Sequence, residues 1–253
     1  MNLITLITDF GRRDWFVGSM KGAILSVQPQ AVIVDITHEI PRGDIRAGAF
    51  ALMASCRCFP RDTVHVVVVD PGVGSNRAAI VVRTSGYYFV GPDNGVLSWA
   101  LAKEKVLEIR QAESQTYFRK PVSCTFHGRD IFAPVAAHLT QGVPIELLGG
   151  RSKDYVHLDW PKPQVVGGCL CGEIVYIDRF GNAISNIESP SETATKVRVP
   201  GKLDCVIKRF YQEVPHGQSL AIVGSIGYLE LSVNGSNAAK TFGLRIGDVV
   251  EVR

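Results

Sequence analysis

The order of the hydrophobic patterns constrains the fold of this chain more than any other feature. In the first half, short apolar runs alternate with segments whose apolar residues recur at helical spacing. The clearest apolar runs are residues 3–7, 31–36 and 64–69, and helical spacing occupies residues 16–27 and 45–56 between them. Asp44 stands before the second helical segment as an N-cap. Strands that alternate with helices favour a largely parallel sheet covered by those helices, so this half predicts an α/β domain.

Further elements are expected between residues 78 and 140. Strands are predicted over 78–83 and 87–90, and a short helix from about residue 96 follows a turn rich in glycine and proline. Asp130 is the predicted N-cap of a helix that runs through residue 139.

The pattern changes beyond residue 150. Residues 151–168 are charged and rich in proline and glycine, the composition of a connection between domains. Past this segment the helical spacing nearly disappears, and short strands separated by turn residues are predicted over 173–177, 183–187, 196–199, 203–207, 220–223, 228–233 and 249–252. We therefore expect an α/β domain over residues 1–160 and a small all-β domain, a barrel or a sandwich, over residues 170–253.

Composition and charge narrow the classes of function. With 46% hydrophobic and 20% charged residues in 253, the chain predicts a compact folded protein. The net charge of +3 is scattered, without a dense basic run, so we expect a small-molecule ligand and no nucleic acid. The first residues lack the basic start of a signal peptide and meet the acidic Asp9, so we expect neither a signal peptide nor a membrane anchor. Six cysteines without zinc-finger spacing favour reduced thiols in a cytoplasmic protein and no metal site.

Polar residues that directly follow apolar runs are candidates for ligand binding, because ligands of open α/β sheets bind beyond the carboxyl ends of the strands. Asp9 follows the first run, and a carboxylate there can accept two hydrogen bonds from a vicinal diol such as a ribose. The alternative for an isolated aspartate is a turn or cap residue.

The segment V-D-P-G-V-G-S-N-R, residues 69–77, follows the third apolar run. A phosphate-binding P-loop is excluded because no Lys-Ser/Thr pair and no helix follow the glycines. Asp70 and Arg77 bracket this loop, which indicates a carboxylate and a guanidinium held close together; a plain Asp-Pro-Gly turn with a solvated arginine is the alternative. His127 lies among small and charged residues in T-F-H-G-R-D and has the best functional setting of the six histidines, with His38 second.

Taken together with these residues, the sequence closely resembles the S-adenosyl-L-methionine (SAM) hydroxide adenosyltransferases, which are related to fluorinating and chlorinating enzymes. The resemblance runs through nearly the whole chain, in the motifs T-D-F-G, M-K-G-A-I, V-D-I-T-H-E-I, V-D-P-G-V-G-S-N-R, G-P-D-N-G-V-L, T-F-H-G-R-D, D-R-F-G-N-A-I-S-N and S-I-G-Y-L-E-L-S-V-N.

The resemblance implies an N-terminal α/β domain, a C-terminal β-barrel and a homotrimer whose SAM sites lie between the N-terminal domain of one subunit and the C-terminal domain of its neighbour. It implies that Asp70, Arg77 and His127 form a catalytic triad that orients and activates water. The reaction that the resemblance implies is hydrolysis of SAM to adenosine and L-methionine by in-line attack on the ribose C5′. No cofactor is implied, since SAM is the substrate.

The resemblance also implies a set of substrate contacts. Asp9 would hold the ribose hydroxyls, Asp14 and Phe126 would line the nearby pocket, and Asn94 is a further candidate. The barrel contributions would be Asp178 and Ser225 toward the methionine portion, with Asn182, Asn234 and Gly235 toward the adenine.

The chemistry suits these residue types, because a sulfonium is already a good leaving group and the difficulty lies with the water nucleophile. Arg77 would supply positive charge, Asp70 would orient its neighbours and His127 would accept the proton. Two departures affect contacts known in fluorinases: Gly43 stands where a fluorinase has an aromatic residue, and Ile226 and Val233 stand where it has arginines. Halide-dependent cleavage of SAM, and a SAM- or adenosine-binding protein with little turnover, remain as alternatives.

Overall fold

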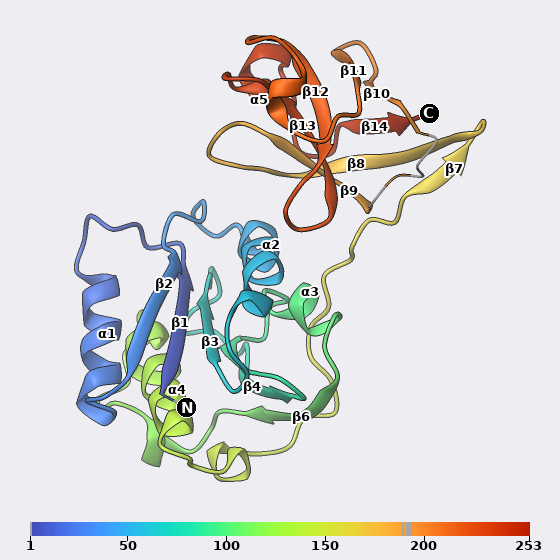
Figure 1. Ribbon diagram of the computed structural model, residues 1–253. Coiled ribbons are helices and arrows are strands. Elements are labelled where there is room, and N and C mark those ends of the chain that lie inside the picture. The colour runs from blue at the N-terminus through green and yellow to red at the C-terminus, as the bar shows by residue number, and fades with distance from the viewer. Residues whose placement is uncertain (1, 189, 191–193) are drawn as a thin grey trace. The chain divides into compact units, whose positions relative to one another are not determined.

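The computed structural model describes residues 2–188, 190 and 194–253 (Figure 1). The chain divides into two compact units, residues 1–158 and 159–253. The division falls within residues 151–168, where the sequence predicts a connection between domains.

A six-stranded mixed sheet forms the centre of the first unit. Its strands, in the spatial order β2-β1-β3-β5-β4-β6, are β2 (Val32–Thr37), β1 (Leu3–Thr8), β3 (Val64–Val68), β5 (Tyr88–Pro92), β4 (Ala79–Thr84) and β6 (Val106–Gln111). The pairs β1–β2, β1–β3 and β3–β5 are parallel, whereas β4 pairs antiparallel with both β5 and β6. The sheet is therefore less parallel than the sequence predicts, because the link between β4 and β5 is a tight turn and a parallel crossover needs about a dozen residues.

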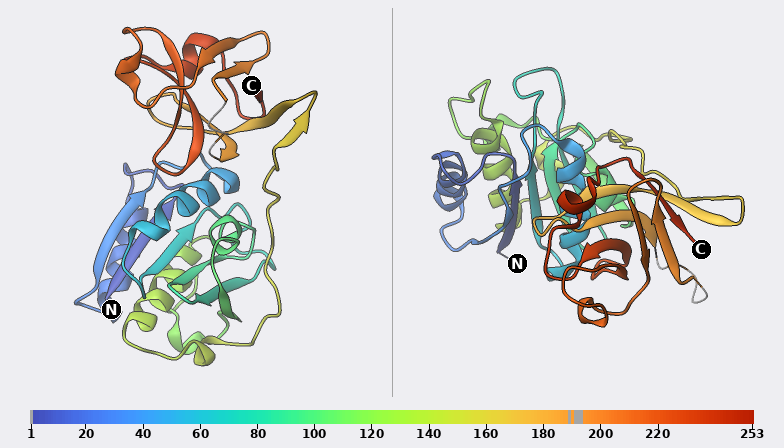
Figure 2. Two further views of the ribbon diagram at one scale, coloured as in Figure 1. Left: turned by 45° about the vertical axis from the view of Figure 1, so that its right-hand side comes forward. Right: turned by 90° about the horizontal axis from the view of Figure 1, so that it is seen from above.

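Helices cover both faces of this sheet (Figure 2). Helices α1 (Phe16–Val27) and α4 (Ala133–Thr140) pack together on one face, and α2 (Ile45–Ser55) and α3 (Ser98–Leu101) pack together on the other. Short helical turns lie at Cys56–Cys58, Gln115–Tyr117, Gly128–Phe132 and Ile145–Leu148. The predicted cap of α2 is confirmed, because the Asp44 carboxylate accepts a hydrogen bond from the Ala47 amide at 2.9 Å. All five residues of β3 are buried, which places the core against this central strand.

The predicted cap at Asp130 is wrong. Asp130 lies inside a π-helical turn, Gly128–Phe132, which leads directly into α4. Its side chain is fully buried and binds the Arg129 guanidinium at 2.7 and 2.9 Å and the Ser123 amide at 2.9 Å. The Asp130 carboxylate therefore accepts hydrogen bonds from the Ser123 loop and from Arg129 and does not cap the N-terminus of α4.

The second unit is a nearly closed antiparallel barrel. Its strands are β7 (Gln164–Val166), β8 (Cys169–Ile177), β9 (Ala183–Glu188), β10 (Lys196–Val199), β11 (Leu203–Val206), β12 (Ser219–Val223), β13 (Tyr228–Val233) and β14 (Val249–Val252). They follow the order β11-β10-β14-β8-β9-β13-β12, with β7 paired to β8. A bridge between Ile207 and Ala221 joins the two ends of this order. The alternating apolar residues of these short strands fill the barrel interior.

Three elements of the second unit escape the sequence analysis, and one of them is the three-residue strand β7, which lies in the predicted connection between domains. Helix α5 (Ala238–Phe242) has five residues, too few for a helical period to show, and the helical turn Tyr211–Glu213 is shorter still. The amide oxygen of Asn237 caps α5 by accepting from the Lys240 amide at 2.7 Å, and Gly243 ends it in the left-handed conformation.

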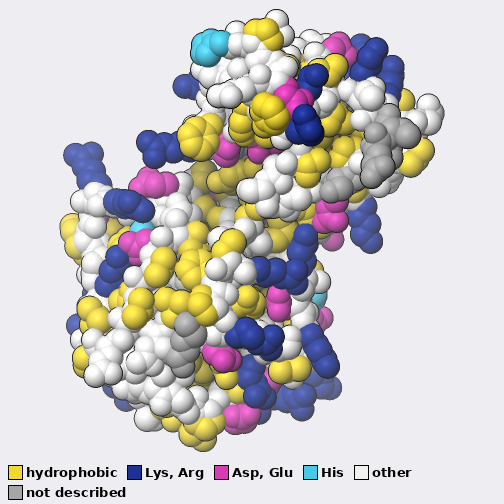
Figure 3. Space-filling model, viewed as in Figure 1, with side chains coloured by type: hydrophobic (Ala, Val, Ile, Leu, Met, Phe, Trp, Pro, Cys, Tyr) yellow, Lys and Arg dark blue, Asp and Glu magenta, His cyan; other side chains and the backbone are white. Residues whose placement is uncertain are grey.

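The distribution of surface charge and the lengths of the helices relate to the prediction that the protein binds neither nucleic acid nor membrane. On the face shown in Figure 3, basic and acidic side chains are interspersed over both units. Among the described residues, no helix is long and apolar enough to cross a membrane.

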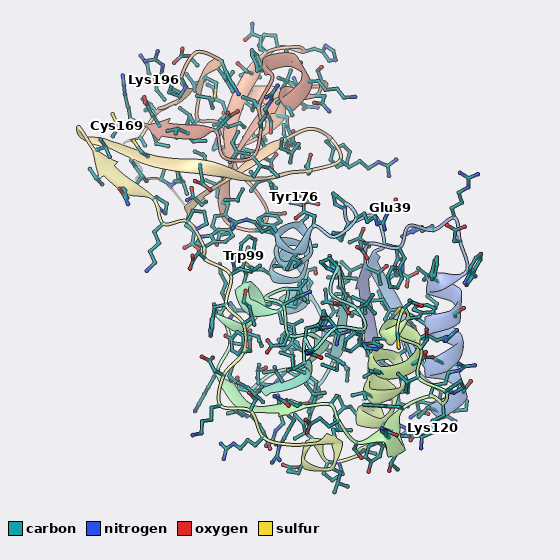
Figure 4. All side chains as sticks on the ribbon, turned by 180° about the vertical axis from the view of Figure 1, so that it is seen from behind. Glu39, Trp99, Lys120, Cys169, Tyr176 and Lys196 are labelled. Carbon is teal, nitrogen blue, oxygen red and sulfur yellow. The ribbon has the colours of Figure 1, made fainter. Side chains whose placement is uncertain are left out.

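Trp99 of α3, labelled in Figure 4, donates from its indole nitrogen to the Leu158 carbonyl at 3.1 Å and so ties the last residue of the first unit to its body.

Candidate active site

A cavity of about 740 Å³ opens at the carboxyl ends of β1 and β3 in the first unit. The residues that line it come from four loops: Asp9, Phe10, Asp14, Phe16, Arg42, Gly43, Val68, Asp70, Pro71, Val73, Thr125, Phe126, His127 and Gly128. Parallel strands end at the same sheet edge, so residues far apart in sequence meet there. The structure brings together Asp9, Asp14, Asp70, Phe126 and His127 of the predicted site.

Asp70, Arg77 and His127 form one connected cluster at this cavity. Arg77 Nε lies 3.0 Å from both carboxylate oxygens of Asp70, and Arg77 Nη2 lies 2.5 Å from Asp70 Oδ2. The same Nη2 lies 2.7 Å from His127 Nδ1. The Arg77 and Asp70 side chains are only 11% and 4% exposed, so their attraction is screened little by water. The arginine therefore bridges the carboxylate and the imidazole.

The hydrogen bond between Arg77 and His127 fixes the tautomer of the histidine. A guanidinium has donors and no acceptor, so His127 Nδ1 accepts from Arg77 and the ring proton of neutral His127 lies on Nε2. Burial, and then the positive charge of Arg77, lower the pKa of His127, while Asp70 and Asp130 act in the opposite direction. His127 thus offers an N–H donor and has no free basic nitrogen in this arrangement.

The loop between Asp70 and Arg77 is held by close backbone packing. Val73 N donates to the Asp70 carbonyl at 3.2 Å, and Ser75 N donates to the Gly72 carbonyl at 3.1 Å. Gly74 has a φ of +78°, and a Cβ added there would overlap the carbonyl oxygen of Cys124. Glycine is required at this position because any side chain would push the loop away from the segment that carries His127.

Asp9 and an aromatic cluster form another part of the cavity lining. Asp9 Oδ2 accepts a hydrogen bond from the Gly43 amide at 2.8 Å. The Phe126 ring meets Phe10 and Phe16 edge-on, with centroids 5.8 and 5.3 Å away. A carboxylate beside aromatic rings suits a ribose joined to an apolar base.

Asn94 does not line the cavity. Its amide nitrogen donates to the Val69 carbonyl at 2.9 Å, and its amide oxygen accepts from the Val96 amide at 3.1 Å. These bonds fix the chain immediately before Asp70. The structure therefore places Asn94 as a support for the cluster.

A second cavity of about 740 Å³ lies in the barrel unit. Its walls are formed by Phe180, Asn182, Phe210, Tyr211, Gln212, Val233, Asn234, Gly235 and Ser236. Three predicted residues, Asn182, Asn234 and Gly235, line it together. Asn182 Nδ2 donates to Asp178 Oδ2 at 3.0 Å, and no described residue bonds its amide oxygen.

The other two barrel candidates lie away from the lining of this cavity. Both oxygens of Asp178 are used by Asn182, one by its side chain and one by its backbone amide at 2.9 Å. Ser225 lies in the exposed turn between β12 and β13. Asp178 thus orients Asn182, and Ser225 is left facing solvent in this unit.

Sequence reasoning missed several lining residues. Phe10 and Phe180 stand inside the motifs T-D-F-G and D-R-F-G-N, where their position beside Asp9 and near Asn182 is the signal that could have found them. Phe180 is 75% exposed and Phe210 is 51% exposed, which is unusual for such large apolar rings. Nothing in the sequence pattern singles out Arg42.

All six cysteines are free thiols. Within the described ranges, no group of three or more His, Cys, Asp or Glu side chains is arranged to hold a metal ion.

The fold and the site define a class of two-unit protein, in which an α/β unit presents an Asp–Arg–His cluster to an open cavity and a β-barrel carries a second, aromatic cavity. The chain belongs to the SAM hydroxide adenosyltransferase family: the family's N-terminal domain matches residues 4–149 and its C-terminal domain matches residues 172–251.

Individual relatives agree with this membership. The chain is 35% identical to the (R)-S-adenosyl-L-methionine hydrolase of Methanocaldococcus jannaschii, covering 100% of this chain and 96% of that protein. It is 28% identical to a fluorinase of Nocardia brasiliensis, covering 99% and 96%. The crystal structure of an uncharacterized conserved protein from Thermotoga maritima is 39% identical, covers 99% of both chains and superposes with a TM-score of 0.92.

Proposed function

We propose that this protein hydrolyses SAM to adenosine and L-methionine. The observation that carries the proposal is the connected Asp70–Arg77–His127 cluster at a cavity that also contains Asp9. The family membership and the name of the hydrolase relative support the same reaction.

The proposed step is an in-line displacement. The water oxygen forms a bond to C5′ of the ribose, and the bond between C5′ and sulfur breaks. The electron pair of that bond goes to sulfur, which leaves as the neutral thioether of methionine. The attacking water loses one proton and becomes the 5′-hydroxyl of adenosine. No general acid is needed because the sulfonium leaves without protonation.

The geometry suggests a division of roles within the cluster. His127 donates through Nε2–H and holds the water in place, since its Nδ1 is already bonded to Arg77. Arg77 supplies positive charge beside the developing hydroxide. Asp70 is the anionic member and accepts the proton through its carboxylate. This differs from the sequence-based hypothesis, in which His127 accepts the proton.

Substrate binding is proposed to use both kinds of cavity. Asp9 accepts hydrogen bonds from the ribose hydroxyls, with Asp14 and Phe126 beside it. The free amide oxygen of Asn182 accepts from the adenine amino group, near Asn234 and Gly235. We propose a homotrimer in which the barrel of a neighbouring subunit supplies this second set, with no cofactor and with the reaction taking place in the cytoplasm.

The test is incubation of the purified protein with SAM in ¹⁸O-labelled water, followed by mass spectrometry of the nucleoside. The two epimers of SAM at sulfur are supplied separately, because the hydrolase relative is named for the (R) form. Labelled adenosine with free methionine is expected, and both products should form much more slowly with Arg77→Ala. Arg83→Ala is the matched control, since Arg83 also pairs with a carboxylate, Glu108, at 2.8 Å but belongs to β4 and contacts neither Asp70 nor His127.

Two other results would redirect the proposal. A 5′-halo-5′-deoxyadenosine formed on adding halide would show halide-dependent cleavage, the activity suggested by the name of the fluorinase relative. Intact SAM with tight retention of adenosine would indicate a binding protein with little turnover.

A further inference from the structure

Polar side chains behind the Asp9 turn form a continuous chain of contacts that the proposed chemistry does not use. Lys21 Nζ of α1 lies 2.7 Å from Asp35 Oδ2 of β2. Asp35 Oδ1 lies 3.1 Å from His38 Nε2, and His38 Nδ1 lies 2.9 Å from Thr8 Oγ1 at the end of β1. Glu39, labelled in Figure 4, marks the loop after β2 that carries His38. The chain joins the motifs M-K-G, V-D-I-T-H and T-D-F-G, which are separate in sequence.

The chemistry of the end groups sets the direction of these contacts. Lysine only donates and the Asp35 carboxylate only accepts, so His38 carries a proton on Nε2, facing Asp35. Nδ1 of neutral His38 then accepts from the Thr8 hydroxyl, whose oxygen in turn accepts from the Phe10 amide at 3.3 Å. The contact between His38 Nε2 and Asp35 Oδ1 is bent away from ideal hydrogen-bond geometry, and neither atom has a hydrogen-bond partner elsewhere among the described residues.

His38 forms hydrogen bonds with the first and the last residue of the T-D-F-G turn. Its side chain bonds Thr8, and its backbone carbonyl accepts from the Gly11 amide at 2.7 Å. Asp9 and Phe10 lie between these two points. Thr8 and His38 are 0% and 1% exposed, so water cannot replace a lost bond without entering the core. Lys21 and Asp35 lie nearer the surface and close the chain.

We propose that Lys21, Asp35, His38 and Thr8 are positioning residues that orient the Asp9 carboxylate for the vicinal diol of a ribose. The inference rests on the proposed function, in which Asp9 binds the ribose hydroxyls. A carboxylate binds the two hydroxyls of a diol more tightly when its plane is already held at the matching angle. The Gly43 amide fixes one oxygen of Asp9, and the buried chain fixes the backbone from which the side chain projects.

The same strand offers a matched control. Thr5 Oγ1 lies 2.7 Å from His65 Nδ1, and both residues are buried at 1% and 0% exposure. Neither of them lines the cavity. Thr5→Val and Thr8→Val therefore each remove from β1 one buried hydroxyl that is hydrogen-bonded to a histidine. Only Thr8→Val lies next to Asp9.

The first measurement is calorimetric binding of adenosine and of 2′,3′-dideoxyadenosine to the whole protein. Thr8→Val should weaken adenosine binding about tenfold and leave dideoxyadenosine binding as in the wild type. Thr8→Ser, which keeps the hydroxyl, should restore adenosine binding, and Thr5→Val should change neither nucleoside. Thermal unfolding of the two valine variants checks that they lose similar stability.

The second measurement is hydrogen exchange of the Phe10 and Gly11 amides without ligand. Exchange should quicken in Thr8→Val and stay unchanged in Thr5→Val. Unchanged exchange, or equal weakening of both nucleosides by Thr8→Val, overturns the inference while leaving the hydrolase proposal intact. A wild type that binds both nucleosides equally instead overturns the ribose assignment of Asp9, and the inference with it.

Discussion

The two cavities have the same volume, about 740 Å³ each, but opposite chemistry. The cavity of the α/β unit is lined by three aspartates, Arg42 and His127, whereas the barrel cavity is lined by aromatic rings, amides and backbone. Arg77 is hydrogen-bonded to two residues that line the first cavity, Asp70 and His127. Charged groups that are only slightly exposed can stabilise developing charge, while rings and amides recognise a flat, neutral base. This difference fits the proposed function, in which the first cavity holds the ribose and the reacting groups and the second recognises the base.

The largest expected effect is loss of turnover from a change in the Asp70–Arg77–His127 cluster at the first cavity. Arg77→Ala should lower kcat by about 10²–10³-fold, because it removes a charge-assisted donor from a site that is largely shielded from water. Single-turnover kinetics with SAM measures this. A loss confined to KM, with kcat intact, would contradict the division between the two cavities.

Acid should destabilise the first unit more than the second. Burial lowers the pKa of His65 from 6.5 to about 4. His65 in the unfolded chain therefore binds a proton near pH 6.5, whereas His65 in the folded chain does so only near pH 4. The free energy of unfolding thus falls as the pH drops from about 6.5 to about 4. The shift corresponds to a loss of about 3 kcal/mol. Denaturant unfolding at both ends of this range measures it.

Two controls sharpen this prediction. His65→Phe keeps a ring among Phe59, Tyr87 and Phe89 and should remove the part of the pH dependence that comes from His65. In the second unit, His216 is exposed. The unfolding of residues 159–253 should therefore change little between about pH 6.5 and about pH 4. Equal acid sensitivity in both units would refute the assignment to His65.

A smaller effect is expected from the barrel cavity. Asn182→Ala removes the amide whose oxygen is free to accept from adenine, so KM should rise about tenfold while kcat changes little. Asn237→Ala is a suitable control, because Asn237 caps α5 in the same unit and lies outside the cavity lining. An equal rise in KM for both variants would point to general loosening of the barrel.

The smallest predicted effect is a shift in the titration of His127. Arg77 lowers the pKa of His127 and Asp70 raises it. Arg77→Ala should therefore raise this pKa, and Asp70→Asn should lower it further. NMR titration of the imidazole reports both directions. A pKa that falls in Arg77→Ala would mean that His127 Nδ1 does not face the guanidinium.

Much of the fold could be predicted from the sequence, because burial imposes a clear period on the strands and on α1 and α2. The hairpin that places β4 antiparallel, the five-residue α5 and the role of Asp130 could not, since each depends on contacts with distant residues. The family motifs identified Asp70, Arg77 and His127 as a group. They could not reveal which nitrogen of His127 faces Arg77, nor that Asn94 and Asp178 support neighbours instead of lining a cavity.

The contact between Gly74 and the Cys124 carbonyl has a consequence for how the sequence can vary. It packs the loop that carries Asp70 and Arg77 directly against the loop that carries His127. A side chain at position 74 would therefore separate the two loops and change the distances within the cluster. In a library of all single substitutions scored for SAM cleavage, position 74 should be as intolerant as position 77, although its residue has no functional group at all.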